Sequence, residues 1–334
     1  MLLVSDTLIG GHGASVVNQA AWFRSAGWDV RVAAPSGEAH ALDEPGHVPT
    51  PIPPSVRSIR GVRVAIKAVR QLRRSWQPDV VHACGARSFL ITRLSGWARP
   101  FVTVHFVTAV PSDPPGFRYV RRLGLRVIPW SAAAAFSARP DNPGRWRFVP
   151  HASDRLRDIE RTPLPASGAA VVLWAGRMSE PKTPEMFVEA MALAAARCAI
   201  RGVMVGDGPL LDRVKQRVAE LGAPVDVLGH VDDPLDHLPG AWATTMFSVD
   251  EALNWAVQEA MWSGRAAVVT PLEGMSWLVG DTGFLARNAA DAADAFVALA
   301  DRDAAERRGA AAAERIRSLI SPDDPWPAIA AAYG

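Results

Sequence analysis

The first 33 residues, MLLVSDTLIGGHGASVVNQAAWFRSAGWDVRVA, contain the pattern that decides the fold. An apolar strand at residues 2–5 leads through a glycine-rich loop at residues 10–13 into a helix at residues 14–26, and a glycine ends that helix. A second apolar strand follows at residues 30–33. Strand, helix and strand in this order predict one β-α-β unit of a parallel sheet.

The same alternation of short apolar strands and helices continues along the chain. It stops once, at a segment rich in Pro, Arg and Asp that is typical of a linker, and then starts again. Two such runs predict an α/β protein with two Rossmann-like, doubly wound parallel-sheet domains. Further strands are expected at residues 80–82, 101–105, 126–128, 170–175, 202–205, 225–228, 244–247 and 266–269. The expected parts are an N-terminal domain at 1–150, a linker at 151–168, a C-terminal domain at 169–320 and a last helical segment at 321–334.

Length and composition agree with two globular domains and narrow the function classes. The chain has 334 residues, 49% of them hydrophobic, and a formal net charge of +2, which gives no indication of a nucleic-acid partner. Its two cysteines, Cys84 and Cys198, are isolated, and no Cys/His spacing indicates a metal site. We expect a cytoplasmic protein, because neither a signal peptide nor an apolar run of about 18 residues is present.

The glycine-rich loop Gly10–Gly11–His12–Gly13 allows a ligand to approach the backbone closely, and the helix after it favours an anion. A tight strand-to-helix turn explains the same glycines equally well. A dinucleotide fingerprint does not fit, because Val16 stands where the third glycine would be.

Two cations follow the first strand of the second domain. Arg177 and Lys182 are five residues apart just past the strand end, so both can reach one diphosphate. Two solvated surface cations are the alternative. The stretch 205–209, after the next strand, is interpreted as a structural turn.

Two glutamates stand eight residues apart further along. Glu251 falls in a loop and Glu259 about two turns into the helix expected to begin near Leu253. A carboxylate on the helix can accept hydrogen bonds from a ribose diol, while one in the loop can face a sugar. Two solvent-facing glutamates are the alternative. Consecutive amides at residues 273–276 can open a helix and hold phosphate oxygens.

The order of these motifs resembles the glycosyltransferase family 4 type of GT-B enzyme, over nearly the whole chain. The resemblance implies two domains facing across a cleft, with the acceptor on the N-terminal domain and a nucleotide-sugar donor on the C-terminal one. It also implies a retaining hexosyltransferase without a bound metal or further cofactor, a UDP- or GDP-sugar as donor, and a last helix packed back on the N-terminal domain. The motifs that carry it also include 78–83, 103–105 and 228–231.

The resemblance assigns roles to individual residues of the second half. Arg177 and Lys182 match residues that bind the donor diphosphate. Glu259 matches the carboxylate that holds the ribose, and Glu251 matches the one near the transferred sugar. Backbone amides of Gly274, Met275 and Ser276 would lie beside that sugar.

Two further roles fall on the first half. Gly11 and Gly13 belong to the loop that would touch the phosphate from the N-terminal domain. His105 matches a histidine near the reacting carbon, where it can bond a sugar hydroxyl or stabilise an oxocarbenium-like state.

The chain departs from the family pattern at several positions. The usual residues are replaced at Phe106, Thr183, Asn254, Trp277 and in the segment 150–154. These departures leave open the acceptor (a natural product, a lipid-linked saccharide or a polysaccharide). They also leave open a GT-B sugar-nucleotide epimerase or hydrolase, and an inactive sugar-nucleotide-binding protein.

A short-chain oxidoreductase is disfavoured because neither tyrosine has a lysine four residues later, and a serine hydrolase because Gly-x-Ser-x-Gly is absent.

Residues 56–76 are expected to form a helix with one basic side. At 100° per residue the cations cover a narrow arc opposite Val, Ala, Leu and Trp side chains. The alternatives are a solvated basic face and peripheral contact with an anionic membrane or an acidic acceptor. The cations are Arg60, Arg63, Lys67, Arg70 and Arg74.

Overall fold

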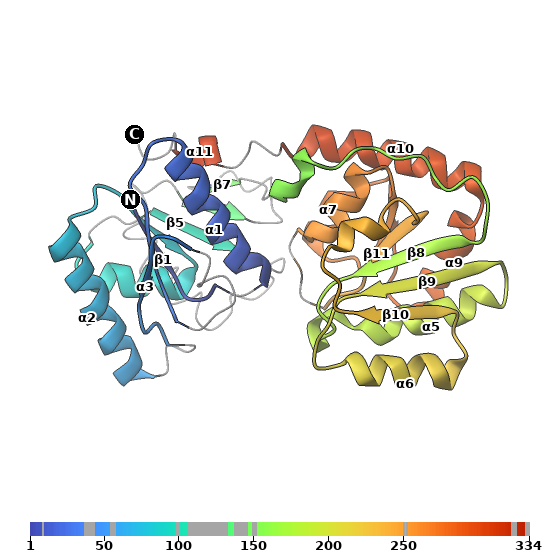
Figure 1. Ribbon diagram of the computed structural model, residues 1–334, viewed down its shortest axis with the longest axis horizontal. Coiled ribbons are helices and arrows are strands. Elements are labelled where there is room, and N and C mark those ends of the chain that lie inside the picture. Colours follow the sequence, from blue (N-terminus) through green and yellow to red (C-terminus); the bar gives the residue numbers. More distant parts are fainter. Residues whose placement is uncertain are drawn as a thin grey trace. The chain divides into compact units, whose positions relative to one another are not determined.

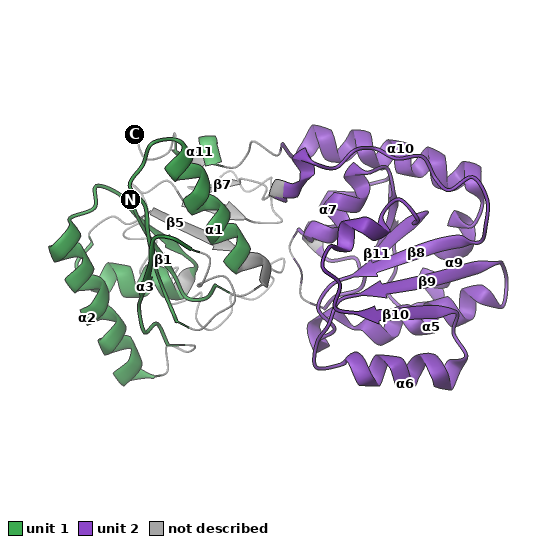
Figure 2. Ribbon diagram, in the orientation of Figure 1, with its two compact units in different colours: residues 1–106, 110–149, 323–334 green, residues 107–109, 150–322 purple. Residues whose placement is uncertain are grey.

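The computed structural model describes most of the chain as two compact units, each with its own parallel sheet (Figures 1 and 2). Unit 1 contains the described residues up to 148 together with 326–330, and unit 2 contains those from 152 to 321. The described residues are 1–8, 10–36, 44–53, 58–97, 101–105, 133–136, 146–148, 152–249, 251, 253–321 and 326–330.

Unit 1 has a seven-stranded sheet in the order β3-β2-β1-β4-β5-β6-β7, and every pair is parallel. The interior strand β1 is buried on both faces, as expected of a parallel sheet. The strands are β1 (Leu2–Ser5), β2 (Arg31–Ala34), β3 (His47–Pro49), β4 (Val81–Cys84), β5 (Phe101–His105), β6 (Ala133–Phe136) and β7 (Trp146–Phe148).

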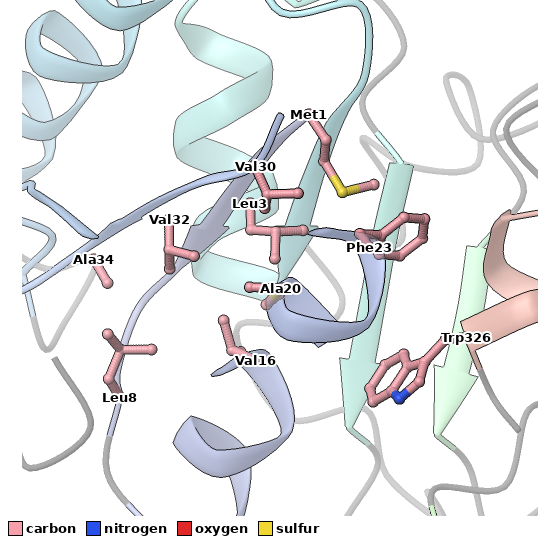
Figure 3. Packing of buried hydrophobic residues seen from close by; sticks show 11 residues of the cluster. Met1, Leu3, Leu8, Val16, Ala20, Phe23, Val30, Val32, Ala34 and Trp326 are labelled. Atoms are coloured by element: carbon pink, nitrogen blue, oxygen red, sulfur yellow. The ribbon is translucent and has the colours of Figure 1, made fainter. Parts of the chain in front are cut away.

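Helices cover both faces of this sheet because successive side chains of a strand point to opposite sides. Leu3 belongs to the core under α1 (Gly10–Ser25), whereas Leu2 and Val4 belong to the core under α2 (Ile59–Trp76) and α3 (Ala86–Leu94). Trp326 of the C-terminal α11 (Trp326–Ala330) joins the first of these cores (Figure 3).

The helix α1 begins earlier than its sequence indicates. The glycines expected to form a loop at 10–13 lie in its first turn instead. A side chain at Gly13 would overlap the backbone of Leu8, so this glycine is required for the chain to turn from strand to helix.

The three short strands β3, β6 and β7 escaped the sequence analysis. The three residues of β3 lie within the proline-rich segment 45–54, and Ala133–Phe136 consists mainly of alanine, which favours helix over strand. The strand expected at 126–128 lies outside the described residues.

Unit 2 has a six-stranded parallel sheet in the order β10-β9-β8-β11-β12-β13. Its strands are β8 (Ala170–Ala175), β9 (Ile200–Val205), β10 (Val225–Gly229), β11 (Ala243–Met246), β12 (Ala266–Val269) and β13 (Phe284–Leu285). Its helices are α5 (Pro184–Ala195), α6 (Leu211–Leu221), α7 (Trp255–Trp262), α8 (Glu273–Val279), α9 (Ala289–Leu299) and α10 (Arg302–Leu319).

The chain enters unit 2 through a segment that two arginine side chains hold in place. Arg265 is fully buried and donates to the carbonyl oxygen of Thr162 at 2.6 Å and to that of Leu238 at 3.1 Å. Burial, and then the nearby charge of Arg161, lower the pKa of Arg265 to about 10. Arg302 donates to Leu164 O at 3.0 Å, so the segment expected as a linker is fixed along unit 2.

Unit 1 contains a buried histidine that makes its stability depend on pH. His82 of β4 is fully buried, with Nδ1 3.5 Å from Gln19 Nε2 on α1. Burial lowers the pKa of His82 from 6.5 to about 3. The folded state therefore keeps this ring neutral, whereas the unfolded chain binds a proton below its ordinary pKa of about 6.5, and stability is lost as pH falls through that window.

We predict that His82→Asn flattens this dependence. Between pH 6.5 and 3 its free energy of unfolding should change less steeply than that of the wild type, by up to about 1.4 kcal/mol per pH unit. Denaturant unfolding at a series of pH values measures the slopes. The exposed His230 provides the control, because His230→Asn should keep the wild-type slope. Equal slopes for His82→Asn and wild type would contradict the prediction.

Candidate functional site

The candidate site lies where the chain reverses direction across the sheet of unit 2. From β8 the chain moves to β9 and β10, and it then returns to place β11 on the other side of β8. Ligands of open α/β sheets bind outside the carboxyl ends of strands at such a switch point. The loops that follow β8 and β11 contain Arg177, Lys182 and Glu251.

An ion pair joins these two loops. Lys182 Nζ donates to Glu251 Oε2, and both side chains are mostly buried, with 22% and 14% of their surface exposed. Two backbone-linked contacts support the pair: Val249 N donates to Pro181 O at 2.9 Å, and Thr183 Oγ1 donates to Phe247 O at 3.1 Å. The structure therefore brings together one cation and one carboxylate that the sequence places 69 residues apart.

Thr183 adopts an unusual backbone conformation beside this pair. Its φ of 35° and ψ of 56° are left-handed, a region that β-branched residues rarely adopt. Glycine is common at this position in the family that the sequence resembles. The hydroxyl bond to Phe247 stabilises Thr183 in a conformation that glycine would adopt without strain.

Asn254 connects Glu251 to the helix that follows. Its Oδ1 accepts from Val257 N at 3.0 Å and caps α7, while its Nδ2 donates to Glu251 Oε2 at 2.8 Å. Replacement of the frequent glycine by Asn254 thus adds a helix cap and a second hydrogen bond to the carboxylate. The helix begins at Trp255, two residues later than its sequence predicts.

Glu259 is buried in α7, with only 7% of its surface exposed. Ser153, which lies at the entry of the chain into unit 2, donates its hydroxyl to Glu259 Oε1 at 2.6 Å. The neighbouring Gln258 accepts from Ser153 N at 3.1 Å and donates to Leu253 O at 3.1 Å. Sequence reasoning missed both Ser153 and Gln258, because nothing in the local pattern relates residues more than 100 positions apart.

Arg177 is exposed at the turn directly after β8. Among the described residues, no hydrogen bond or ion pair engages its guanidinium. The backbone beside it is fixed, because Met178 N donates to Asp207 O at 2.9 Å and Leu210 N donates to Met178 O at 3.0 Å. Side chains at Gly206 and Gly208 would overlap residues 176 and 178, in agreement with a structural role for that turn.

The amides expected after β12 lie in the first turn of α8. Gly274 and Met275 are buried, and they occupy positions whose N–H groups have no acceptor within the helix. Ser276 differs, because its N–H donates to Leu272 O at 2.7 Å. Of the three amides predicted at residues 274–276, those of Gly274 and Met275 can therefore meet a ligand.

The remaining predicted residues belong to unit 1. His105 is the last residue of β5, and its side chain is not among those the structure describes. Gly11 and Gly13 lie in the first turn of α1, which follows the interior strand β1. Each thus stands at the carboxyl side of the unit 1 sheet.

The site combines cations, buried carboxylates and helix-opening amides at one sheet edge. Such groups can bind an anion together with a hydroxyl-bearing ligand.

Within the described residues, no three His, Cys, Asp or Glu side chains gather as a metal site would require. No helix in the same residues is long and apolar enough to cross a bilayer.

Solved structures with the same fold cover nearly the whole chain. HepE from Anabaena, in complex with UDP, is 17% identical, with a TM-score of 0.77 over 99% of this chain and 98% of that one. The sucrose-phosphate synthase of Thermosynechococcus elongatus is 19% identical, with a TM-score of 0.76 over 99% and 96% of the two chains. A glycosyltransferase from Rickettsia africae is 14% identical, with a TM-score of 0.76 over 99% and 97%.

Two family models match successive parts of the sequence. Glycosyltransferase Family 4 matches residues 9–156, and Glycosyl transferases group 1 matches residues 169–302. Comparison with the sequences of curated proteins gives no match. The two models together with the parallel sheets of both units show that the chain belongs to the family 4 type of glycosyltransferase, with the GT-B fold.

Proposed function

We propose that this glycosyltransferase uses a nucleotide-diphosphate sugar as donor and binds it at the carboxyl ends of β8 and β11. The observation that carries the proposal is the Lys182–Glu251 pair at the switch point of unit 2. When the donor binds, the ion pair opens. Lys182 then binds the diphosphate, and Glu251 binds the hydroxyls of the transferred sugar. Arg177, which has no side-chain partner among the described residues, supplies the second cation.

The donor class draws support from one structural neighbour. HepE was solved with UDP, with UDP and glucose, and with UDP-glucose. We propose a UDP- or GDP-sugar for the present chain, with Glu259 on the ribose and the amides of Gly274 and Met275 beside the sugar. A thermal-shift screen across UDP-, GDP-, ADP- and dTDP-sugars tests this, because a bound donor raises the unfolding temperature by mass action.

The proposed reaction retains the configuration of the sugar and needs no metal ion. The bond between the anomeric carbon and the diphosphate oxygen breaks, and the diphosphate leaves with the bonding electrons. The acceptor oxygen forms the new bond on the same face, and its proton passes to the departing diphosphate. Arg177 and Lys182 stabilise the negative charge that grows on the leaving group, the kind of preorganised stabilisation that dominates many enzymes.

Unit 1 supplies the acceptor side of the proposed reaction. The role proposed for His105 is to bond a sugar hydroxyl or stabilise the oxocarbenium-like state, and the role proposed for Gly11 and Gly13 is to let the backbone contact the phosphate. The acceptor is a natural product, a lipid-linked saccharide or a polysaccharide. Release of free sugar, with or without an acceptor, would favour a hydrolase. Formation of an epimerised donor under the same conditions would favour an epimerase. Donor binding without turnover would favour an inactive sugar-nucleotide-binding protein.

We predict that Lys182→Ala and Arg177→Ala each lower the transfer rate by about 10²–10³-fold, because each removes one preorganised charge from the leaving group. Release of the nucleoside diphosphate from the donor found in the screen measures the rate. Lys215→Ala, which removes an exposed cation from α6 of the same unit, is the matched control and should keep the wild-type rate. Full activity in a folded Lys182→Ala variant would remove the diphosphate assignment.

We also propose that unit 1 contacts an anionic lipid surface through α2. The helix buries Ala65 and Val69 against the sheet. Five cations face outward, and from Ser58 to Gln77 the sequence has no acid that could neutralise them.

The structure separates one of these five cations from the others. Arg70 donates to Leu94 O at 3.2 Å and holds the end of α3, so its role is structural. The other four are exposed, and in the described part of the chain none has a hydrogen-bonding or ion-pair partner: Arg60, Arg63, Lys67 and Arg74.

One observation favours a lipid surface over nucleic acid, and a second favours an anionic partner of either kind at unit 1. The aliphatic side chains of Ile59 and Val64, 68% and 47% exposed, flank the cations and can enter a headgroup layer. The charge is also divided along the chain: residues 1–150 have 19 Lys and Arg against 8 Asp and Glu, whereas residues 151–334 have 17 against 26. An anionic surface therefore attracts the first part, at +11, and repels the second, at −9.

We predict that replacing the four unpartnered cations of α2 by Gln weakens binding to anionic vesicles by at least about 10²-fold, since each cation near such a surface contributes about 1 kcal/mol. Co-sedimentation with phosphatidylcholine vesicles, with and without phosphatidylglycerol, measures it. A control variant removes the same charge from unit 2 by replacing four exposed cations: Arg201, Lys215, Arg287 and Arg307. Equal vesicle binding by the two variants, or displacement of the wild type from vesicles by duplex DNA, would overturn this contact.

A further inference from the structure

We infer that Ser153 is a positioning residue that orients the Glu259 carboxylate toward the donor nucleotide. Ser153 is fully buried and Glu259 nearly so, and the hydroxyl donates to Glu259 Oε1 at 2.6 Å. This inference rests on the proposed role of Glu259 in binding the ribose. It assigns a role to one residue of the segment 150–154, in which the chain departs from the family pattern.

A buried glutamate needs such a partner for two reasons. Its carboxylate is costly to remove from water unless hydrogen bonds satisfy it. Its side chain also has three rotatable bonds, and a carboxylate that must meet two neighbouring ribose hydroxyls binds them best when its plane is already fixed. The Ser153 hydroxyl supplies one such hydrogen bond and fixes one of the two oxygens.

Ser153 can fix the carboxylate because its own position is determined twice. Its amide donates to Gln258 Oε1 at 3.1 Å, and Gln258 is itself held through Nε2 by Leu253 O at 3.1 Å. Gln258 and Glu259, which are adjacent in α7, therefore both hydrogen-bond to Ser153. Directly after Ser153, the 3-10 turn Asp154–Arg157 is attached to Asp233 through Arg155.

The same network connects the two glutamates of the site. Leu253, which accepts the Gln258 hydrogen bond, lies two residues after Glu251. The segment entering unit 2, the helix bearing Glu259 and the loop bearing Glu251 thus share one set of hydrogen bonds. A change at Ser153 acts on the nucleotide end of this set first, because its hydroxyl bonds directly to Glu259.

The test measures ribose recognition rather than stability alone. Calorimetric titration with UDP, GDP and ADP, each beside its 2′-deoxy counterpart, gives the ratio of ribo to deoxy affinity. For the nucleotide that binds, Ser153→Ala should weaken the ribo form about tenfold, the loss of roughly one hydrogen bond to a charged group. The deoxy form should change much less, so the ratio falls. Ser153→Thr, which keeps the hydroxyl, should restore most of it.

Two further variants separate the possible failures. Ser263→Ala removes another buried hydroxyl bond at the end of the same helix, Ser263 Oγ to Ala260 O at 2.8 Å, and should leave the ratio unchanged. Glu259→Gln should abolish the preference for ribose. If Glu259→Gln still binds the ribo form more tightly than the deoxy form, the proposed ribose role of Glu259 is wrong. Loss of preference in Glu259→Gln but not in Ser153→Ala would overturn only the positioning role of Ser153.

Discussion

The Lys182–Glu251 ion pair is the interaction on which the candidate site depends. It joins loops from two neighbouring strands of unit 2, and both partners are largely shielded from water, where opposite charges attract more strongly than on an open surface. Removing one partner of such a pair leaves the other uncompensated, so the two loops act together. The pair holds a cation and a carboxylate ready for a ligand that presents negative charge and hydroxyl groups side by side.

The fold makes this pair possible through strand order. Because β11 returns to the open side of β8, loops separated by three strands in the sequence end at the same sheet edge. The helix α7 then fixes the second loop from behind: Asn254 caps the helix while holding Glu251, and Gln258 holds Leu253. The positions that differ from the family pattern in this region, Thr183 and Asn254, each gain a hydrogen bond that glycine cannot form.

The sequence predicted the features that depend on local pattern. Apolar strands alternating with helices identified both sheets, and the order of motifs identified the family. Short strands such as Ala133–Phe136 were missed because their residues favour helix, and α1 was expected to begin four residues late because its first turn contains three glycines. The contacts of Ser153 with Gln258 and Glu259, and of Arg70 with Leu94, join distant segments, so no local spacing reveals them.

The central claim is that the pair at the switch point of unit 2 receives the donor diphosphate. A crystal structure with a bound nucleotide-diphosphate sugar, or with the diphosphate product, tests it most directly. We expect diphosphate oxygens at hydrogen-bonding distance, about 3 Å, from Lys182 Nζ. The Glu251 carboxylate should then accept hydrogen bonds from the sugar hydroxyls and no longer from Lys182. A nucleotide bound elsewhere on unit 2 while the Lys182–Glu251 pair stays intact would contradict it.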